Sequence, residues 1–448
     1  MPDNEDRVLG RPSKAFFIDM ITRDIGVGQC ILDLVYNAID QAIERSNLDV
    51  MKTLTNGAGA PGAAGGTVSV AFSRERLLIE DTCGGIPINE ARNEIFLFGN
   101  PIQKTGFPGL SVYGIGMKRA FFKLGNFIQM ESFTEGEYFA IDIDVDKWKN
   151  QGDDNWDFRF QKYESPKKTK RNMPPGTRIE ITGFRDGIGE RLSQISFQND
   201  LELKLAATYA LFLKAGIKVT VNDSPVVYSL PTVGREAKIV PARKQFRHED
   251  VEILIIAGIT PKEDKRAHGW YVFCNGRMVL ESDKSRNTGW GEQLPSFHSK
   301  YNHFVGYVYF RSDEVRKLPW TTTKDAVVYD SPVYQAALPE MQILSRPILD
   351  FLNDLYPGEM DPEGVLEREF LEKARRITID QLAKKDTSFF VRGLREAKIK
   401  KENRLEWIRY RKPAKDIERA RTCIGKKQMS PSQIGSHTFD YFLKQECD

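Results

Sequence analysis

The chain has 448 residues, of which 40% are hydrophobic and 28% charged, and its formal net charge at pH 7 is +3. This length allows two or three domains with ample core, and the small net charge does not indicate a particular class of partner. Five scattered cysteines, without paired metal-ligand spacing, favour a reducing compartment and argue against a disulfide framework or a zinc site. No apolar run approaches ~18 residues and the N-terminus does not resemble a signal peptide, so we expect no membrane span and a cytoplasmic location.

The stretch Ile31–Ala42 predicts an amphipathic helix around which the rest of the chain is organised. Its apolar residues recur at helical spacing: Ile31, Leu34, Val35, Ala38, Ile39 and Ala42. Asp33, Asn37 and Asp40 lie beside this stripe and place three oxygen-bearing side chains along one flank. Aspartate and asparagine are poor helix formers. The flank is therefore either simply solvated or a site for a hard cation and phosphate, because magnesium prefers oxygen ligands.

Two later stretches favour the second interpretation. Arg76–Pro87 reads RLLIEDTCGGIP, in which Asp81 ends a short apolar run beside a glycine pair that lets backbone approach a ligand. Gly109–Gly125 reads GLSVYGIGMKRAFFKLG, a glycine-rich turn followed by helical spacing and then by Gly125 as a C-cap. Such a turn offers free N–H groups and a positive helix end to an anion.

The segments between these stretches have simpler patterns. Thr55–Gly66 is nearly all Gly, Ala and Pro and predicts a flexible loop, not a phosphate loop, because no Lys-Ser/Thr follows. Thr67–Phe72 and Leu77–Glu80 predict a hairpin. The glycine-hinged, partly apolar segment 85–114 is either a lid that orders over a nucleotide or an ordinary surface loop.

The remaining elements predict an α+β sandwich, one mixed sheet with helices on one face, and then a second α/β domain. The expected elements of the sandwich are strands Phe127–Phe133, Tyr138–Val145 and Thr177–Phe184, helix Leu201–Lys214 and strand Ile217–Val221. Charged Glu236–Glu249 breaks the pattern, so we expect a boundary near Pro225–Val240. Strands Val251–Ala257, Trp270–Phe273, Met278–Leu280 and Phe304–Phe310 follow, and we expect domains at 1–225, 226–360 and 361–448.

The C-terminal third is predicted to be helical from Glu363 and basic beyond Arg392, with Trp407 and Tyr410 interleaved. This pattern is typical either of a nucleic-acid-binding surface or of a charged, solvated helix.

The three polar and glycine-rich stretches resemble, in order and spacing, the N, G1 and G2 boxes of the GHKL ATPases. That superfamily holds gyrase B, the ninety-kilodalton heat-shock chaperones, histidine kinases, MutL and the MORC proteins. GTRIEI at Gly176–Ile181 resembles the fourth box, and YGIGMKRAFFKLG is closest in wording to the MORC-like and MutL-like branches. The resemblance covers residues ~15–330 and implies a Bergerat-type ATP-binding sandwich.

The same resemblance extends to a transducer-like second domain. VFCNGRMV at Val272–Val279 looks like its strand–turn–strand, and LPWTTTKD at Leu318–Asp325 looks like its lysine loop. The resemblance also implies that N-terminal residues reach across to a second subunit. From the sequence alone, Ala15–Met20 is equally an edge strand or a frayed arm.

ATP and Mg²⁺ are the cofactors that the resemblance implies. Asn37 should be the magnesium ligand, Asp81 should accept from the adenine amine, and Thr177 should assist through its hydroxyl or a water. The other nucleotide-binding positions that it implies are Asp40, Gly85, Ile86, Gly109, Tyr113, Gly114, Ile115, Gly116, Met117 and Lys118. Lys118 either pairs with phosphate or faces solvent.

Asp33 and Lys324 are the catalytic residues that the resemblance implies. Asp33 should orient or deprotonate the attacking water, although the family usually carries Glu there, which puts hydrolysis in doubt. Lys324 should reach the γ-phosphate, the alternative being a surface lysine. The G1 box also departs from the family, since Cys83 replaces its first glycine and Gly84 is added.

Three functions are compatible with these features. The first is a slowly hydrolysing, ATP-driven homodimeric clamp that closes on nucleic acid or on a protein partner. The others are an ATP-gated binding module that does not hydrolyse ATP, and a chaperone-like subunit of a larger complex. None of the five histidines lies in a recognisable phosphoacceptor helix, which disfavours a histidine kinase. Family analogy alone suggests genome maintenance or anti-phage defence.

Overall fold

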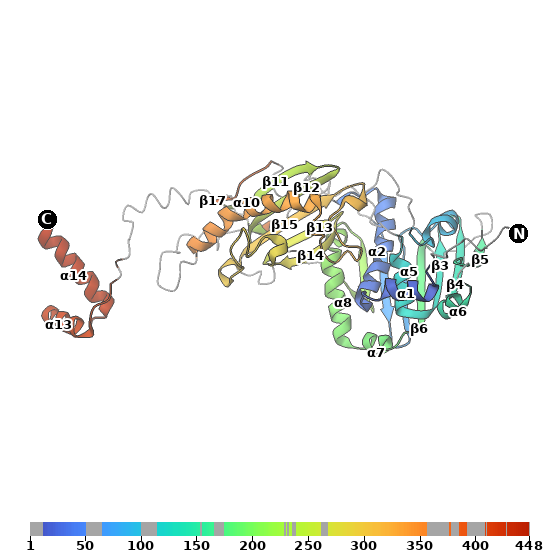
Figure 1. The fold of residues 1–448 in the computed structure, drawn as a ribbon, viewed down its shortest axis with the longest axis horizontal. Helices are drawn as coiled ribbons and strands as arrows, with labels where there is room; N and C mark the ends of the chain where they lie inside the picture. Colours follow the sequence, from blue (N-terminus) through green and yellow to red (C-terminus); the bar gives the residue numbers. More distant parts are fainter. Residues whose placement is uncertain are drawn as a thin grey trace, which may run out of the picture. The chain divides into compact units, whose positions relative to one another are not determined.

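The computed structural model describes residues 12–50, 65–99, 114–152, 155–164, 174–227, 230, 233–234, 239–260, 268–355, 376–377, 385–391, 408, 410–426 and 428–447. The chain forms two compact units, Met1–Leu394 and Arg395–Asp448 (Figure 1). Gly109, Tyr113 and most of the basic run after Arg392 lie outside the described residues.

The first unit begins with a mixed sheet in the order β5-β4-β3-β6-β2-β1-β7-β8. Its strands are β1 (Thr67–Phe72), β2 (Arg76–Asp81), β3 (Gly125–Phe133), β4 (Tyr138–Asp144), β5 (Phe160–Glu164), β6 (Gly176–Phe184), β7 (Lys218–Val221) and β8 (Ser224–Pro225). The predicted hairpin is confirmed, because β1 pairs with β2 antiparallel and places Val70 opposite Ile79. On its other side β1 pairs with β7 parallel, which makes the sheet mixed as predicted.

Helices pack against this sheet, and α2 (Val27–Ser46) is central among them (Figure 1). Its predicted apolar stripe is buried at every position: Ile31, Leu34, Val35, Ala38, Ile39 and Ala42. The neighbouring helices are α1 (Lys14–Thr22), α5 (Gly116–Leu124), α6 (Val145–Asn150), α8 (Ile195–Thr208) and α9 (Ala210–Lys214). The single helix predicted at 201–214 is instead α8 and α9, which separate at Tyr209, where φ is −109° and ψ is 16°.

The N-terminal helix α1 corrects the expectation of an edge strand or a frayed arm. Ser13 caps it, because its hydroxyl accepts a hydrogen bond from the N–H of Phe16. Lys14 is fully buried, and its Nζ donates to the carbonyl oxygens of Trp148 at 2.9 Å and Gln151 at 3.2 Å. The sequence did not reveal this helix because its anchor is a lysine, a residue that usually lies in solvent.

The short segment that precedes the glycine-rich turn is also partly helical. It contains α4 (Ile88–Glu90), the π-helical turn η1 (Ala91–Ile95) and then Phe98. The ring of Phe98 lies 5.2 Å from that of Phe17 and 5.9 Å from that of Trp148, between centroids. The start of the predicted lid is therefore fixed by aromatic packing against α1 and α6.

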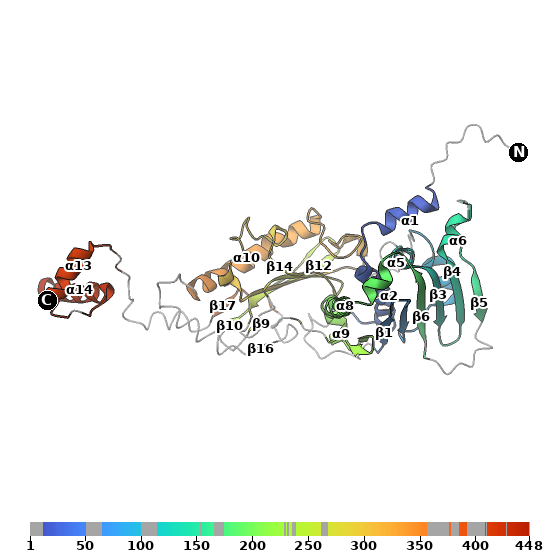
Figure 2. The same ribbon diagram turned by 90° about the horizontal axis from the view of Figure 1, so that it is seen from below.

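A second sheet follows in the order β11-β12-β15-β13-β14. Its strands are β11 (Ala242–His248), β12 (Val251–Ile259), β13 (Gly269–Cys274), β14 (Arg277–Asp283) and β15 (Phe304–Arg311). The helix α10 (Pro332–Leu355) covers one face of it (Figure 2). The four predicted strands are confirmed. Charged 236–249 nevertheless contains β11, an edge strand whose exposed polar residues break the apolar pattern.

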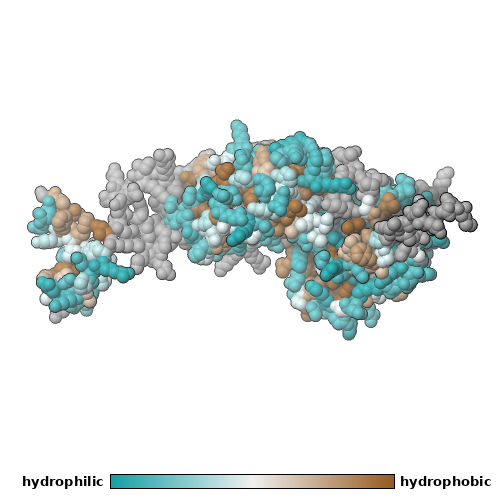
Figure 3. All heavy atoms as spheres, viewed as in Figure 1, coloured by the Kyte–Doolittle hydropathy of each residue, from teal (hydrophilic) through white to brown (hydrophobic). Residues whose placement is uncertain are grey.

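The C-terminal third is only partly helical in the described residues. The prediction of helix from Glu363 is wrong at Arg376–Ile377, which form the short strand β16 paired with β9 (Val233–Gly234). The second compact unit contains α13 (Ala414–Ile424) and α14 (Pro431–Glu446). Four large apolar or aromatic side chains remain exposed on α14: Phe439, Tyr441, Phe442 and Leu443. Figure 3 shows brown, hydrophobic atoms on this unit. Within the described stretches, the helices are too short or too polar to cross a membrane.

Candidate functional site

The polar flank of α2 lies at the centre of the site. Asp33 is only 5% exposed, whereas Asn37 and Asp40 are partly exposed on the following turns. The Oδ2 of Asp33 accepts from Nη2 of Arg119 at 2.7 Å, and its Oδ1 accepts from Nε2 of Gln29 at 3.1 Å. The first turn of α5 and the first turns of α2 thus meet at this carboxylate.

A second arginine reaches the same carboxylate from the second sheet. Nη2 of Arg277, on β14, lies 3.6 Å from Oδ1 of Asp33. Arg277 and Arg119 are both buried, and the Nε atom of each has no hydrogen-bond partner among the described residues. Two buried guanidinium groups share one close carboxylate, and this arrangement leaves donors available to a further anion.

The N-terminus of α5 borders this group of charges. Gly114 has a φ of +58°, and Ile115 leads into the helix at Gly116. A Cβ at Gly116 would lie 3.7 Å from Oδ2 of Asp33, so the helix begins directly beside the carboxylate. Met117 points into the core. Backbone N–H groups at this end can therefore face an anion next to Asp33.

Lys118 does not face solvent, so that alternative is wrong. The side chain is buried, and its Nζ donates to the carbonyl oxygens of Ile95 and Leu97, each at 2.7 Å. Burial lowers the pKa of Lys118 to about 7. In this structure the lysine holds the end of η1 against α5.

Asp81 and Thr177 lie together at the ends of β2 and β6. Oδ1 of Asp81 accepts from the backbone N–H of Cys83 at 2.8 Å. Burial raises the pKa of Asp81 to about 6, against the effect of hydrogen bonds from the backbone of Cys83 and Thr177. The hydroxyl groups of Thr177 and Ser132 are 3.3 Å apart. Ser132 also accepts from the backbone N–H of Ile86 at 2.6 Å, which connects the G1-like loop to β3.

Gly85 is required by packing within the protein. Its φ is +69°, and a Cβ there would lie 1.8 Å from the carbonyl oxygen of Phe133. The loop between β2 and α4 therefore crosses β3 with no space for a side chain. The sequence predicted a glycine for close approach to a ligand, and the structure adds this separate reason.

The lysine-loop segment folds back onto α2. The backbone carbonyl oxygen of Thr323 accepts from Nε2 of Gln29 at 3.1 Å, so one glutamine contacts both this loop and Asp33. Nζ of Lys324 lies 4.1 Å from the ring centroid of Tyr36 and 5.4 Å from that of Trp320. Burial, together with the charge of Arg277, lowers the pKa of Lys324 to about 7.

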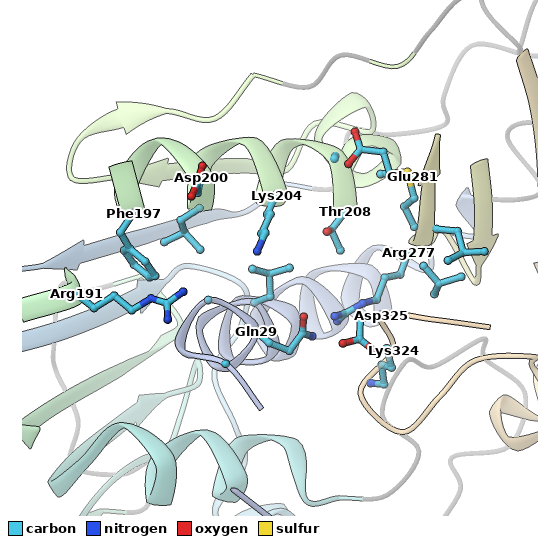
Figure 4. Close-up of a pocket in the computed structure, with 18 residues that line it drawn as sticks. Gln29, Arg191, Phe197, Asp200, Lys204, Thr208, Arg277, Glu281, Lys324 and Asp325 are labelled. Carbon is cyan, nitrogen blue, oxygen red and sulfur yellow. The ribbon is translucent and has the colours of Figure 1, made fainter. Parts of the chain in front are cut away.

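A cavity of about 450 Å³ lies beside these charges, between the start of α2, α8, β14 and the lysine loop (Figure 4). In Figure 4, Gln29, Arg277, Lys324 and Asp325 gather at one end of it. Neither Asn37 nor Asp81 lines this cavity, so it is separate from the polar flank and the G1-like loop.

Sequence reasoning missed four residues of the site: Gln29, Ser132, Arg119 and Arg277. Arg119 follows Lys118 in the first turn of a predicted helix, and a basic pair beside a glycine-rich turn is a signal that could have been used. Arg277 lies in a quoted motif, but its partner is far away in the chain. Gln29 and Ser132 carry no distinguishing pattern.

Comparison with known families matches residues 27–174 to the histidine kinase-, DNA gyrase B- and HSP90-like ATPase family. The matched stretch contains α2, the glycine-rich turn before α5 and Asp81. No curated protein sequence matches the chain. The order of these elements, the mixed sheet with its helices and the family match agree. Residues 27–174 therefore form an ATPase domain of the GHKL superfamily.

Proposed function

We propose that the chain is a Mg-ATP-dependent clamp or conformational switch that hydrolyses ATP slowly. In this proposal residues 1–225 bind the nucleotide, residues 226–360 act as a transducer-like domain carrying Lys324, and residues 361–448 form a C-terminal region. ATP binding promotes closure or homodimerisation. The clients that follow from the family analogy are nucleic acid, through the basic C-terminal region, or a protein partner.

The observation that carries the proposal is the convergence of cations on Asp33. Arg119, Arg277 and Lys324 come from three separate segments, and both guanidinium groups have an Nε without a partner among the described residues. A triphosphate carries several negative charges and many acceptor oxygens, so it fits this surplus of donors. Among the described residues no side chain caps α5, so its first N–H groups can add to the same site.

The donors for Mg²⁺ and adenine also fit. Asn37 and Asp40 present oxygen atoms on one face of α2, and magnesium needs few protein ligands because it keeps waters and binds phosphate oxygens. On the other side, Asp81 would accept from the exocyclic amine of adenine. Asn37 would hold Mg²⁺, which would supply positive charge at the phosphates. The protein's part is to hold and orient the reactants through Asn37, Asp81, Thr177 and the α5 turn.

Asp33 is our candidate for orienting the attacking water. Aspartate is one methylene shorter than the usual glutamate, and a misplacement of ~1 Å can cost about 10²-fold in rate. Its carboxylate is also held by Gln29 and two arginines. Both features support slow turnover, which suits a switch better than a motor.

Sedimentation of the full chain tests the proposal. We expect ATP to bind in the presence of Mg²⁺, and a non-hydrolysable analogue to increase the sedimenting mass at protein concentrations well above the dimer dissociation constant. Addition of DNA reports on the nucleic-acid client, whose binding should weaken with salt. Asn37→Ala is the control, because it removes the proposed magnesium ligand. Absence of ATP binding by the wild-type chain would overturn the proposal.

The second candidate is an ATP-gated module that does not hydrolyse ATP. The crowding of Asp33 favours it, because two hydrogen bonds, from Gln29 and Arg119, and the ion pair with Arg277 reduce the room for a water at this carboxylate. Phosphate release measured under steady-state conditions separates the two candidates. Release that is no faster than in the Asp33→Asn variant would identify the non-hydrolysing module.

A further inference from the structure

Arg277 connects the second sheet to the carboxylate at the centre of the site. The side chain is 1% exposed and comes from β14, which lies at the edge of the described second sheet. Its guanidinium carbon lies 4.6 Å from the ring centroid of Tyr36 and 5.6 Å from that of Tyr209. Nη1 donates to the hydroxyl of Tyr209 at 3.3 Å, and Nη2 lies 3.6 Å from Oδ1 of Asp33. One buried side chain thus joins the second sheet to α2, which packs against the first sheet.

The two arginines do not hold Asp33 equally. Arg119 approaches to 2.7 Å and belongs to the same part of the fold as α2, whereas Arg277 stays at 3.6 Å and belongs to the second sheet. Charge-assisted hydrogen bonds strengthen as they shorten into the 2.7–2.9 Å range. The Arg277 contact is therefore the weaker of the two. We expect it to separate before the Arg119 contact when another group binds the carboxylate of Asp33.

The surroundings of Arg277 can accommodate this separation. Arg277 lines the cavity of about 450 Å³ together with three carboxylates, Asp200, Glu281 and Asp325, of which Asp325 lies beside it (Figure 4). A guanidinium that leaves Asp33 remains close to negative charge, so the cost of burying it without a partner is avoided. The rings of Tyr36 and Tyr209 also stabilise the guanidinium of Arg277 through cation–π contacts.

We propose that Arg277 is a positioning residue that ties Asp33 to β14 in the nucleotide-free protein and separates from it when nucleotide occupies the flank of α2. The conformation of the second sheet then depends, through one buried ion pair, on whether nucleotide is bound at the site. This inference rests on the proposed function, because it takes that flank as the nucleotide site. It adds a specific route between the two sheets, distinct from the lysine loop.

Hydrogen exchange of the full chain tests the inference without relying on turnover. In the wild type we expect a non-hydrolysable ATP analogue to change amide exchange in β14 by about fivefold or more, a typical size for coupling between sites. Arg277→Gln should bind the analogue more weakly, because it loses a proposed phosphate donor. At analogue concentrations that saturate this variant, exchange in β14 should be the same with and without the analogue. Asp33→Asn, which removes the charge of the partner, should cause the same loss of response, and Arg277→Lys should restore part of it.

The chain offers a matched control. Arg311, at the end of β15, forms an ion pair with Asp49, with 3.1 Å between Nε and Oδ2, and this pair also joins the second sheet to the segment after α2. Arg311→Gln should retain the response of β14, because Arg311 does not contact Asp33. Loss of the response in this variant would show that any weakening of the interface suffices, and would overturn the specific role of Arg277.

Two further results would contradict the inference. One is a wild type that binds the analogue without any change in β14. The other is an Asp33→Asn variant that keeps the response while Arg277→Gln loses it, because Arg277 would then act through packing alone.

If the wild type binds no nucleotide, the proposed function itself fails. If it binds and responds but the Arg277 variants respond equally, only this inference fails. Should Arg277→Gln not fold, Asp33→Asn and Arg277→Lys carry the same test.

Discussion

The carboxylate of Asp33 and the guanidinium of Arg119 form a buried ion pair, with 2.7 Å between Oδ2 and Nη2, that joins α2 to the first turn of α5. The glycine-rich turn ends at this same turn of α5, since Gly116 is its first residue. Any change at Asp33 therefore alters both the proposed catalytic carboxylate and the contact between two helices. The choice of substitution decides which effect is measured.

Asp33→Asn should abolish ATP hydrolysis and leave binding of a non-hydrolysable analogue within a few-fold of wild type. The amide retains the shape of the side chain and can still accept a hydrogen bond from Arg119, but it cannot take a proton. Asp33→Ala should in addition lower the free energy of unfolding by about 3 kcal/mol, because it leaves buried guanidinium groups without their carboxylate. Phosphate release and chemical denaturation measure the two effects. Hydrolysis at the wild-type rate in both variants would place the base elsewhere.

Asn37→Ala should weaken ATP binding about tenfold or more in the presence of Mg²⁺, the size expected for losing one charge-assisted or metal contact. In excess EDTA the same substitution should have little effect, because the lost oxygen matters only as a metal ligand. Isothermal titration with and without Mg²⁺ gives both affinities. An equal loss under the two conditions would assign Asn37 a direct contact with nucleotide and remove it as the metal ligand.

The pKa of Asp81, raised to about 6 by burial, predicts a pH dependence of nucleotide binding. Only the ionised carboxylate is a full acceptor, so ATP affinity should fall as the pH drops through about 6, by up to about tenfold per unit. Asp81→Asn should lack this component, while titration of the phosphates remains the same in both proteins. Identical pH profiles for the two proteins would contradict the assignment.

The raised pKa of Asp81 also predicts how the stability of the protein changes with pH. Between pH 3.8 and about 6 the folded protein holds a proton on Asp81 that the unfolded chain has lost. The contribution of Asp81 to stability therefore decreases as the pH rises through this window. Thermal unfolding of wild type and Asp81→Asn across this range measures the difference, which should be absent at lower pH and largest above pH 6.

Lys324→Met should weaken binding of the ATP analogue and spare ADP, because we propose that this lysine meets the γ-phosphate. The substitution retains the apolar stem that packs near Tyr36 and Trp320. It should also change stability between pH 7 and 10.5. There the wild-type lysine is more protonated when unfolded, so its contribution to stability rises with pH. Equal losses for ATP and ADP would make the lysine structural.

Gly85→Ala should lower the free energy of unfolding by at least about 2 kcal/mol, since a left-handed backbone and a steric conflict act together. The new Cβ would lie 1.8 Å from the backbone oxygen of Phe133, which cannot move without disturbing β3. Gly28→Ala is the matched control, because a Cβ at Gly28 meets no atom within 4 Å and lies in the first turn of α2. Denaturation curves for the pair compare the two sites directly.

The sequence was sufficient where one-sided burial produces a period. The stripe on α2 follows from that rule and is buried as predicted. The predicted strand β1 shows the same effect, because Val68 and Val70 are buried and alternate with more exposed residues. Prediction from the sequence failed where polar residues have a structural role, as with Lys14 in α1 or the charged edge strand β11. Arg277 shows the limit for the site, because its role depends on a contact with Asp33 that no local spacing encodes.

Two ion pairs connect α2 and the residues just after it to the second sheet. Asp33, near the start of α2, pairs with Arg277, and Asp49, beyond the end of α2, pairs with Arg311. At 1.5 Å per residue, the helix alone separates these points by about 20 Å. A rigid body pinned to another at two points keeps only a rotation about the line between them. As far as these pairs constrain it, the second sheet can turn only about an axis close to that of α2. If Arg277 separates from Asp33 as proposed, only the pair of Asp49 and Arg311 remains. That single pair allows the second sheet to rotate in any direction about Asp49.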